Sequence, residues 1–229
     1  MCGRINVSAD PLAELYLELL DQKFSGEDRY NVAPTEQVSV IRRSREGGLV
    51  ARDKRWWLTP YWSKELSTRY SMFNAKSETL ESSRAYREPF LRRRCVVPIS
   101  GFYEWLKDGE RRLPYYIRPA GNEGLLLAGL WDRWRGADEV VESFTIITTA
   151  VHDRLAFIHN RQPVILRRAD LECWLDEASE PEQLRELLTT TLPTALLAIP
   201  VSTYVSNSRN EGPRCIEPIA AAVEVSADP

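Results

Sequence analysis

The sequence predicts an α+β fold with a mixed, mostly antiparallel β-sheet or barrel-like core flanked by helices. Short apolar, β-branched or aromatic runs recur between turn residues, which is typical of strands. Helical patterns are few and do not alternate regularly with these runs, so a parallel doubly wound sheet is not expected. With 229 residues and a hydrophobic fraction of 43%, the chain can bury one large core, and we expect a single domain over residues 1–229.

The first half of the chain is expected to hold one helix followed by strands. Apolar residues at helical spacing after Asp10 predict an amphipathic helix. Pro34 excludes a helix in the segment that follows, whereas the alternation of Val38 and Val40 indicates a strand. The predicted order is a helix from Asp10 that ends before Ser25-Gly26, an extended segment over 29–35, a strand over 37–42, a turn at Gly47-Gly48 and a return strand over 49–57.

The second half is expected to be richer in strands. Apolar runs with β-branched or aromatic residues predict most of its elements, and Pro98 and Gly101 interrupt one of them. The predicted order is a short helix over 82–90, a strand over 95–105 broken at those two residues, strands over 114–117, 125–131 and 144–149, helices over 170–175 and 181–188, and strands over 196–201 and 215–219.

Charge is distributed unevenly along the chain. The net charge is −3, yet residues 1–114 hold 20 Lys+Arg against 16 Asp+Glu, and residues 115–229 hold 10 against 17. A local basic face can bind phosphates despite a negative total charge, because salt screens charges over about 8 Å. No stretch has the pattern of a signal peptide or a membrane span. We therefore expect a cytoplasmic protein, associated with the nucleoid if the source is bacterial.

The cysteines and histidines do not form a metal-binding pattern. The four cysteines, Cys2, Cys95, Cys173 and Cys215, lie too far apart for a Cys-x-x-Cys pair, and the chain has only two histidines. We expect free thiols, no metal and no cofactor.

The position of Cys2 carries chemical information. Removal of Met1 would leave a cysteine with both a free α-amine and a thiol. An α-amine has a pKa of about 7.7 to 8.0, so part of it is neutral near pH 7 and can form an imine with an aldehyde. The thiol can then add to that imine and close a five-membered thiazolidine, which neither a lysine nor an internal cysteine can do. A small residue after the initiator is also ordinary, so this observation needs support from other segments.

Four segments carry polar residues where a simple core would have apolar ones: 2–4, 73–79, 101–105 and 158–166. Each has a structural explanation when taken alone. Asn74 could cap a turn, Glu104 could pair with a surface arginine, and His159 could be a hydrogen-bonded residue between strands.

Taken together, the motifs of the whole chain resemble those of the SRAP family, the SOS-response-associated peptidase-like proteins. The resemblance covers nearly every residue and keeps the motifs in the family's order. The motifs are MCGR at 1–4, RYNVAPT at 29–35, WWLTPYW at 56–62, NAKSET at 74–79, RCVVPISGFYEW at 94–105, AGLWD at 128–132, FTIITTA at 144–150, HNRQPVIL at 159–166 and VSNSRNEGPRCIEP at 205–218.

The resemblance implies a function in the DNA damage response. Members of the family sense abasic sites in single-stranded DNA, and their Cys2 crosslinks to the ring-opened aldehyde as a thiazolidine that shields the lesion. The family's name refers to self-removal of the leading methionine with Cys2 as nucleophile, which would make the protein an autocatalytic cysteine peptidase, or hydrolase. A general methionine aminopeptidase is an equally economical agent, because cysteine is a small residue at position 2. The imine could instead undergo β-elimination, as in an abasic-site lyase. The partner implied is single-stranded DNA with abasic sites, bound by a monomer.

The resemblance also implies roles for individual residues. Catalytic positions fall on Cys2, Asn74, Glu104 and His159. His159 would move the proton that opens the sugar ring, because its reference pKa is near neutral. Glu104 would exchange protons with the Cys2 amine or thiol, helped by burial that raises its pKa. Asn74 does not titrate, and it would orient the amine or the sugar.

DNA-binding positions are implied as well. Arg4, Lys76, Arg84 and Arg161 fall where the family contacts the backbone, and Trp62 falls where a hydrophobic wedge separates bases. The chain departs from the family at Trp57, where glycine is usual, and at Lys76, where arginine is usual. Lysine presents a point charge instead of a bidentate fork, so DNA affinity could differ from that of relatives.

Two other classes of function remain open from the residues alone. One is an N-terminal-nucleophile amidohydrolase or protease in which Cys2 attacks an amide and His159 is its base. The other is a non-covalent reader of single-stranded DNA that uses the arginines and Trp62. An abasic oligonucleotide distinguishes them, since only the crosslinking protein forms a covalent species that depends on the lesion.

Overall fold

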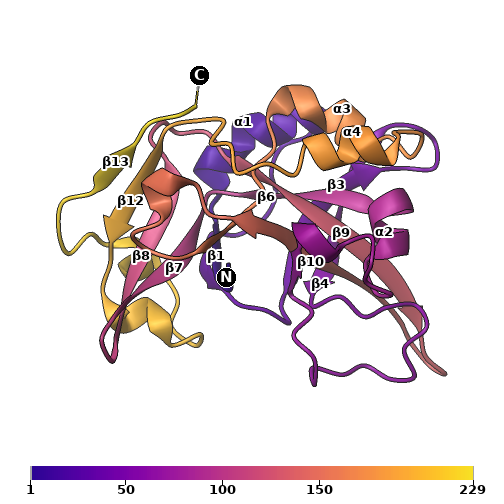
Figure 1. The fold of residues 1–229 in the computed structure, drawn as a ribbon, viewed down its shortest axis with the longest axis horizontal. Coiled ribbons are helices and arrows are strands. Elements are labelled where there is room, and N and C mark those ends of the chain that lie inside the picture. The colour runs from indigo at the N-terminus through magenta and orange to yellow at the C-terminus, as the bar shows by residue number, and fades with distance from the viewer. Residues whose placement is uncertain (1, 229) are drawn as a thin grey trace.

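The computed structural model describes residues 2–228, which fold into two β-sheets with α1, α3 and α4 gathered along one side (Figure 1). The first sheet has six strands in the order β13-β12-β8-β7-β1-β2. In chain order these strands are β1 (Ile5–Val7), β2 (Arg29–Val32), β7 (Gly101–Asp108), β8 (Arg111–Pro119), β12 (Leu196–Pro200) and β13 (Val223–Val225).

The second sheet has seven strands, and five of them close into a barrel. The path β10-β4-β3-β6-β9 returns to β10, because β9 and β10 also pair with each other. β5 and β11 pair with β10 farther along the strand. In chain order the strands are β3 (Gln37–Arg43), β4 (Leu49–Trp56), β5 (Asn74–Lys76), β6 (Arg94–Ile99), β9 (Leu125–Arg135), β10 (Val140–Ala150) and β11 (Arg161–Pro163).

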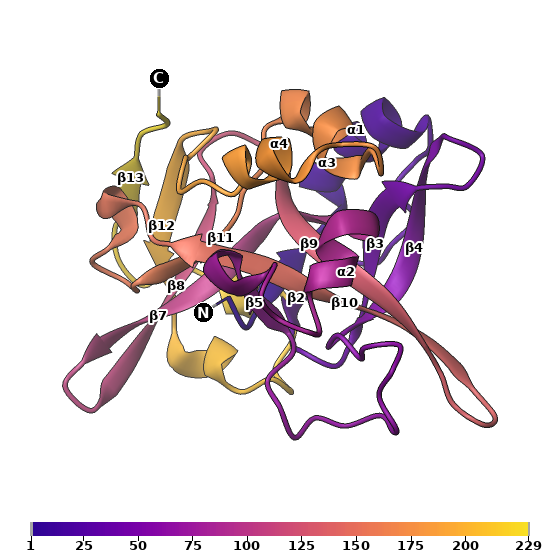
Figure 2. The ribbon, with the colours of Figure 1, turned by 45° about the vertical axis from the view of Figure 1, so that its right-hand side comes forward.

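The pairing pattern confirms the predicted fold class. Over residues 2–228, the pairings β10–β4 and β10–β5 are parallel, and the other named strand pairs are antiparallel. Two long hairpins, β7–β8 and β9–β10, project from opposite sides of the molecule (Figure 2). The helices are α1 (Ala9–Leu20), α2 (Arg87–Arg92), α3 (Leu171–Leu175) and α4 (Pro181–Glu186).

The apolar spacing of α1 places its apolar side chains on one buried face of the helix. Leu12, Leu15 and Tyr16 are buried on one face, whereas Leu17 is exposed. The helix begins at Ala9, whose N–H donates to the Asp28 side chain (2.7 Å). A carboxylate there satisfies a backbone donor that has no partner within the helix.

The barrel interior is apolar and aromatic. Trp56 and Phe144 are both fully buried and stack with ring centroids 6.3 Å apart. The Trp56 indole N–H donates to the Phe73 carbonyl (2.9 Å), so this aromatic core has its polar atom satisfied. Phe73 immediately precedes β5, which places the core next to the segment that carries Asn74.

Of the two interruptions predicted, at Pro98 and Gly101, only the second is found: β6 ends at Ile99, the chain bends at Ser100, and β7 begins at Gly101. Pro98 is within β6, opposite Leu126, and the chain changes from the second sheet to the first after Ile99. A Cβ at Gly101 would lie 2.5 Å from the Tyr116 ring, so only glycine allows β7 to begin so close to β8.

Two other predicted elements were wrong in type or position. The helix predicted over 82–90 begins only at Arg87. Residues 213–216 form a 3₁₀ helix instead of the predicted strand, because Pro213 fixes a helical φ at its first position. The last strand is β13, which pairs with β12.

Candidate active site

Cys2 lies directly before β1, and the pairing of β1 with β7 sets its surroundings. Ile5 lies opposite Phe102, and the Tyr103 N–H donates to the Arg4 carbonyl (3.0 Å). Continued in the same register, the chain brings residues 2–3 alongside Glu104. The Cys2 side chain is fully buried. Burial raises the pKa of the Cys2 thiol, and the nearby charge of Glu104 raises it further, so the thiol is protonated at neutral pH.

Asn74 joins the second sheet to this segment. It is the first residue of β5, opposite Ile146 of β10, and its Nδ2 donates to the Cys2 carbonyl (2.7 Å). Asn74 is buried, and its Oδ1 has no hydrogen-bond partner within residues 2–228. The amide therefore fixes the backbone of Cys2 and leaves one buried acceptor beside it.

Glu104 is a buried carboxyl group on β7, opposite Tyr115 of β8. Its residue is only 3% exposed. Burial raises the pKa of Glu104 from its ordinary 4.5 to about 7. A group with this pKa can both accept and donate a proton near neutral pH, which suits general acid–base catalysis.

His159 shares a small pocket with Glu104. Phe102, Ile117 and Ile158 also line this pocket, whose volume of about 10 Å³ is roughly the room for one water. Burial lowers the pKa of His159, so the ring is neutral at pH 7. His159 Nδ1 lies 3.0 Å from the Arg161 backbone nitrogen and 3.3 Å from the Arg161 carbonyl oxygen, so the Arg161 backbone fixes this side of the ring.

The four predicted catalytic residues thus lie in one region where the two sheets meet. Cys2, Asn74 and Glu104 form one buried cluster, and His159 is joined to it through the pocket that it shares with Glu104. Within residues 2–228 no group of three or more His, Cys, Asp or Glu side chains could hold a metal ion. No helix in that range is long and apolar enough to cross a membrane.

Two of the predicted DNA-binding arginines are half-buried and held by internal partners. Arg4 donates to Asn31 Oδ1 (2.6 Å) and to the Val205 carbonyl (2.8 Å). Arg161 donates to the Thr148 carbonyl (2.6 Å) and makes a two-pronged ion pair with Glu78, one prong of which is 3.0 Å. Both guanidinium groups therefore organise the site from within.

The other three predicted DNA-binding residues are on the surface. Lys76 is the exposed last residue of β5. The Arg84 guanidinium lies over the Trp62 ring, 4.1 Å from its centroid, and Trp62 is 38% exposed. Trp62 and Arg84 line a pocket of about 520 Å³. Leu58, Pro60, Tyr70, Met72 and Ala85 form the apolar part of its walls, and Thr59, Ser63, Lys64, Glu65, Ser67 and Arg69 line the rest.

Two residues with clear roles were not singled out from the sequence. Asn31 holds three carbonyls of the 205–210 segment and accepts from Arg4. Glu78 is the carboxylate that forms the ion pair with Arg161. Both residues belong to motifs on which the family resemblance rests, at 29–35 and 74–79, and this membership is the sequence feature that could have identified them. The Trp57 ring, at a position where the sequence departs from the family, packs against Phe73 with centroids 5.4 Å apart.

The fold is thus a barrel joined to a second sheet, with Cys2 buried beside Asn74 where the two meet. The family model described as SOS response associated peptidase (SRAP) matches residues 1–208. The chain therefore belongs to the SRAP family.

Several named relatives align with most of this chain. The chain is 30% identical to the abasic site processing protein YoqW of Bacillus subtilis, over 95% of this chain and 99% of that one. It is 27% identical to YedK of Escherichia coli, also named an abasic site processing protein, over 96% and 100% of the two chains. The homologue HMCES of Gallus gallus, with the same description, is 36% identical over 76% of this chain and 59% of its own.

Solved structures agree with the fold. A protein from Bacteroides thetaiotaomicron superposes with a TM-score of 0.81 at 24% identity, covering 96% of this chain and all of that one. A phage-related protein from Bordetella bronchiseptica gives a TM-score of 0.69 at 28% identity, covering 87% and 94% of the two chains.

Proposed function

We propose that this protein captures abasic sites in single-stranded DNA covalently, through the amine and thiol of Cys2. The observation that carries the proposal is the buried cluster itself. Asn74 holds the Cys2 carbonyl at 2.7 Å, next to a carboxyl group whose pKa is about 7. The named relatives process abasic sites, whose ring-opened form offers the aldehyde that an aminothiol captures.

The reaction balances without a cofactor. The Cys2 amine adds to the aldehyde carbon, the resulting carbinolamine loses one water to give an imine, and the thiol adds across the C=N bond. The thiol proton passes to a base and the ring nitrogen gains one, so the net products are a thiazolidine and one water. Without ring closure the imine could undergo β-elimination and cut the strand, so fast thiol addition protects the DNA.

The amine must be free before this chemistry begins. We include self-removal of Met1, with Cys2 as nucleophile, in the proposal; Met1 lies outside the described residues. Burial raises the pKa of the Cys2 thiol, so the thiol needs a base as it reacts. Glu104 would accept its proton as it adds to the imine, and neutral His159 would exchange the proton that opens the sugar ring.

Mass spectrometry and a denaturing gel test the proposal together. Processed protein is incubated with an oligonucleotide that carries one abasic site and with an intact control. We expect a slower band only with the abasic strand, and an intact mass equal to protein plus DNA minus one water, with the link at residue 2. An adduct at another residue, or no adduct after Met1 has been removed, would contradict the proposal. No adduct together with amide hydrolysis would favour the amidohydrolase alternative, and salt-sensitive binding that ignores the lesion would favour the non-covalent reader.

Asn74→Ala should slow crosslinking roughly 10- to 100-fold without changing its pH dependence. The substitution removes the donor that fixes the Cys2 carbonyl, so the amine is misplaced, but an amide does not titrate. Single-turnover rates from about pH 5.5 to about pH 9, a range that spans the reference pKa values of histidine and the α-amine, measure both effects.

Asn122→Ala, which removes an exposed amide bonded to Asp10, is the matched control and should crosslink normally. A shifted pH profile in Asn74→Ala would mean that Asn74 tunes a titrating group instead of positioning Cys2.

Glu78→Gln should bind undamaged single-stranded DNA about two to five times more tightly. The Glu78 carboxylate neutralises Arg161, and its pKa is held below the ordinary range by that arginine's hydrogen bond. Removing the carboxylate leaves the positive charge of Arg161 for a phosphate, while the bond from Arg161 to the Thr148 carbonyl remains. A partly exposed pair of this kind is worth up to about 1 kcal/mol.

Fluorescence anisotropy at fixed salt measures this affinity. Glu81→Gln is the matched control, because Glu81 pairs with Arg185 (2.8 Å) on the same segment and should leave DNA binding unchanged. Weaker binding by Glu78→Gln would show that the carboxylate orients Arg161 instead of competing for it.

A further inference from the structure

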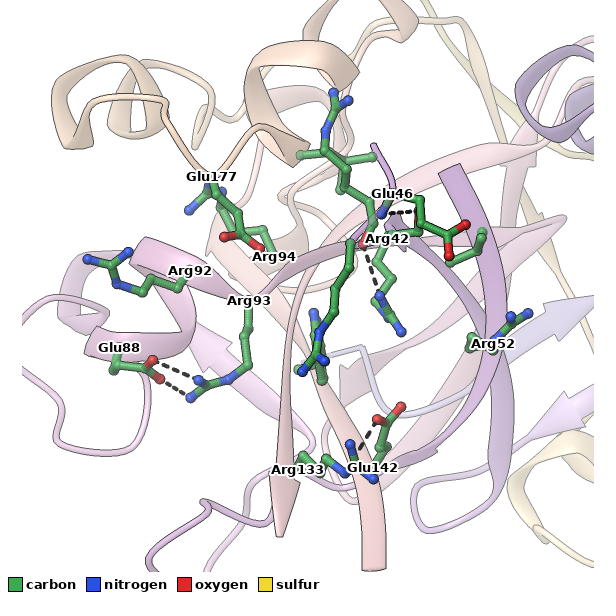
Figure 3. A pocket seen from close by; sticks show the side chains of 16 residues that line it. Arg42, Glu46, Arg52, Glu88, Arg92, Arg93, Arg94, Arg133, Glu142 and Glu177 are labelled. Carbon is green, nitrogen blue, oxygen red and sulfur yellow. Dashed lines mark hydrogen bonds and ion pairs between the residues drawn. The ribbon is translucent and has the colours of Figure 1, made fainter. Parts of the chain in front are cut away.

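A large arginine-lined pocket occupies one mouth of the barrel (Figure 3). All five barrel strands contribute to it, and its volume is about 560 Å³. Eight arginines and four glutamates line it, so its formal charge is strongly positive although the chain's net charge is −3. Asn74 of the Cys2 cluster pairs farther along β10, at Ile146, so this mouth is a separate site.

Some of these arginines are tied to the fold. Two Arg93 nitrogens donate to the Glu88 carboxylate (Figure 3). Arg93 also lies 3.2 Å from Asp132. Arg94 is buried and donates to three backbone carbonyls. Arg43 pairs with Glu172 (2.6 Å). These contacts hold the three arginines against the fold. The positive charge of the pocket therefore comes mainly from the other arginines.

Besides Arg94, four lining arginines have no carboxylate within ion-pair distance in the described part of the chain: Arg42, Arg45, Arg52 and Arg92. In addition, the Nε–H groups of Arg42, Arg43 and Arg93 are buried with no hydrogen-bond partner in residues 2–228. Buried donors without acceptors are costly. Because these Nε atoms have almost no accessible surface, an anion in the pocket would instead neutralise the charge of the four arginines without a carboxylate partner.

The aromatic residue of the pocket indicates which part of a ligand is recognised. Lys54, which is fully buried, lies 4.3 Å from the centroid of the Trp131 ring, and Arg42 lies 5.0 Å from it. These cation–π contacts occupy the Trp131 ring, so it does not serve as a stacking surface for a nucleic-acid base. Guanidinium forks match phosphate oxygens, and a pocket of this size can hold several phosphate groups.

We propose that the barrel mouth binds a chain of phosphate groups, without reading bases. Two sources share this chemistry: a free polyphosphate, or the backbone of a nucleic acid. The site does not depend on the chemistry of Cys2, and its ligand is held by ionic hydrogen bonds from arginines that have no carboxylate within ion-pair distance.

Calorimetric titration of the full chain with inorganic tripolyphosphate tests the site. We expect saturable binding to the unsubstituted protein, and roughly tenfold or greater loss of affinity in the double variant Arg45→Glu/Arg92→Glu. Arg45 and Arg92 are exposed, so the fold should persist, and thermal unfolding verifies this. The single variants Arg45→Glu and Arg92→Glu are titrated as well. Lys23→Glu is their control, because it makes the same charge change at an exposed position outside the pocket.

A second titration, with an undamaged single-stranded oligonucleotide, separates the two sources. Parallel loss of oligonucleotide and tripolyphosphate binding in the double variant supports the nucleic-acid backbone, whereas loss of tripolyphosphate binding alone supports a free polyphosphate. The proposal is overturned if tripolyphosphate does not bind, or if the Arg45 and Arg92 variants bind it as well as Lys23→Glu does. Crosslinking to abasic DNA is measured separately, so failure there leaves this result intact.

Discussion

Cys2→Ala should form no heat-stable crosslink with abasic DNA. The alanine amine can still attack the aldehyde, but no sulfur is present to close the ring, so the product stops at an imine that water reverses. Borohydride should trap that imine as a covalent adduct, and some strands should be cut by β-elimination. A denaturing gel with and without heating, run with and without borohydride, measures stable adduct, trapped adduct and cleavage in one experiment.

Cys173→Ala is the matched control for this experiment, because Cys173 is a free, half-buried cysteine on α3 outside the cluster. It should crosslink like the unsubstituted protein. A heat-stable adduct in Cys2→Ala would refute the thiazolidine. A failure of borohydride to trap anything would instead point to a thiol that acts without the amine.

The fold was predictable where the signal is local. The alternation of Val38 and Val40 gave the strand now seen as β3, and the glycine turn after it gave the β3–β4 hairpin. The error around Pro98 has a different origin. Whether the chain breaks at Pro98 or Ser100 depends on which sheet each half joins, and that is decided by partners distant in sequence.

The site was predictable from chemistry at one position and from motifs at the others. Cys2 could be inferred from what an N-terminal aminothiol does. Its proximity to Asn74 and Glu104 depends on two long-range pairings, β1 with β7 and β5 with β10, which periodicity does not encode. The ion pair between Glu78 and Arg161 was missed for the same reason. Glu78 follows β5 and Arg161 begins β11, and both of these strands pair with β10.

A stability measurement separates the catalytic role of Glu104 from a structural one. Its pKa is raised from 4.5 to about 7, so the folded state holds a proton that the unfolded chain releases between these values. Stability should therefore fall as pH rises through this window, by at most about 3 kcal/mol. Glu104→Gln lacks this loss and should be the more stable protein at about pH 8. Thermal unfolding of both proteins at about pH 5 and about pH 8 tests this, because these values lie on either side of most of the Glu104 titration.

Despite that stability, Glu104→Gln should crosslink roughly 100-fold more slowly, because it cannot accept the proton of the Cys2 thiol. In the unsubstituted protein the rate should rise as pH passes about 7, where Glu104 ionises. The glutamine variant should lack this inflection and keep only the rise that comes from the α-amine. Glu104→Asp, which retains a carboxyl group, should restore part of the rate and the inflection. An unchanged inflection near pH 7 in Glu104→Gln would show that a group other than Glu104 takes that proton.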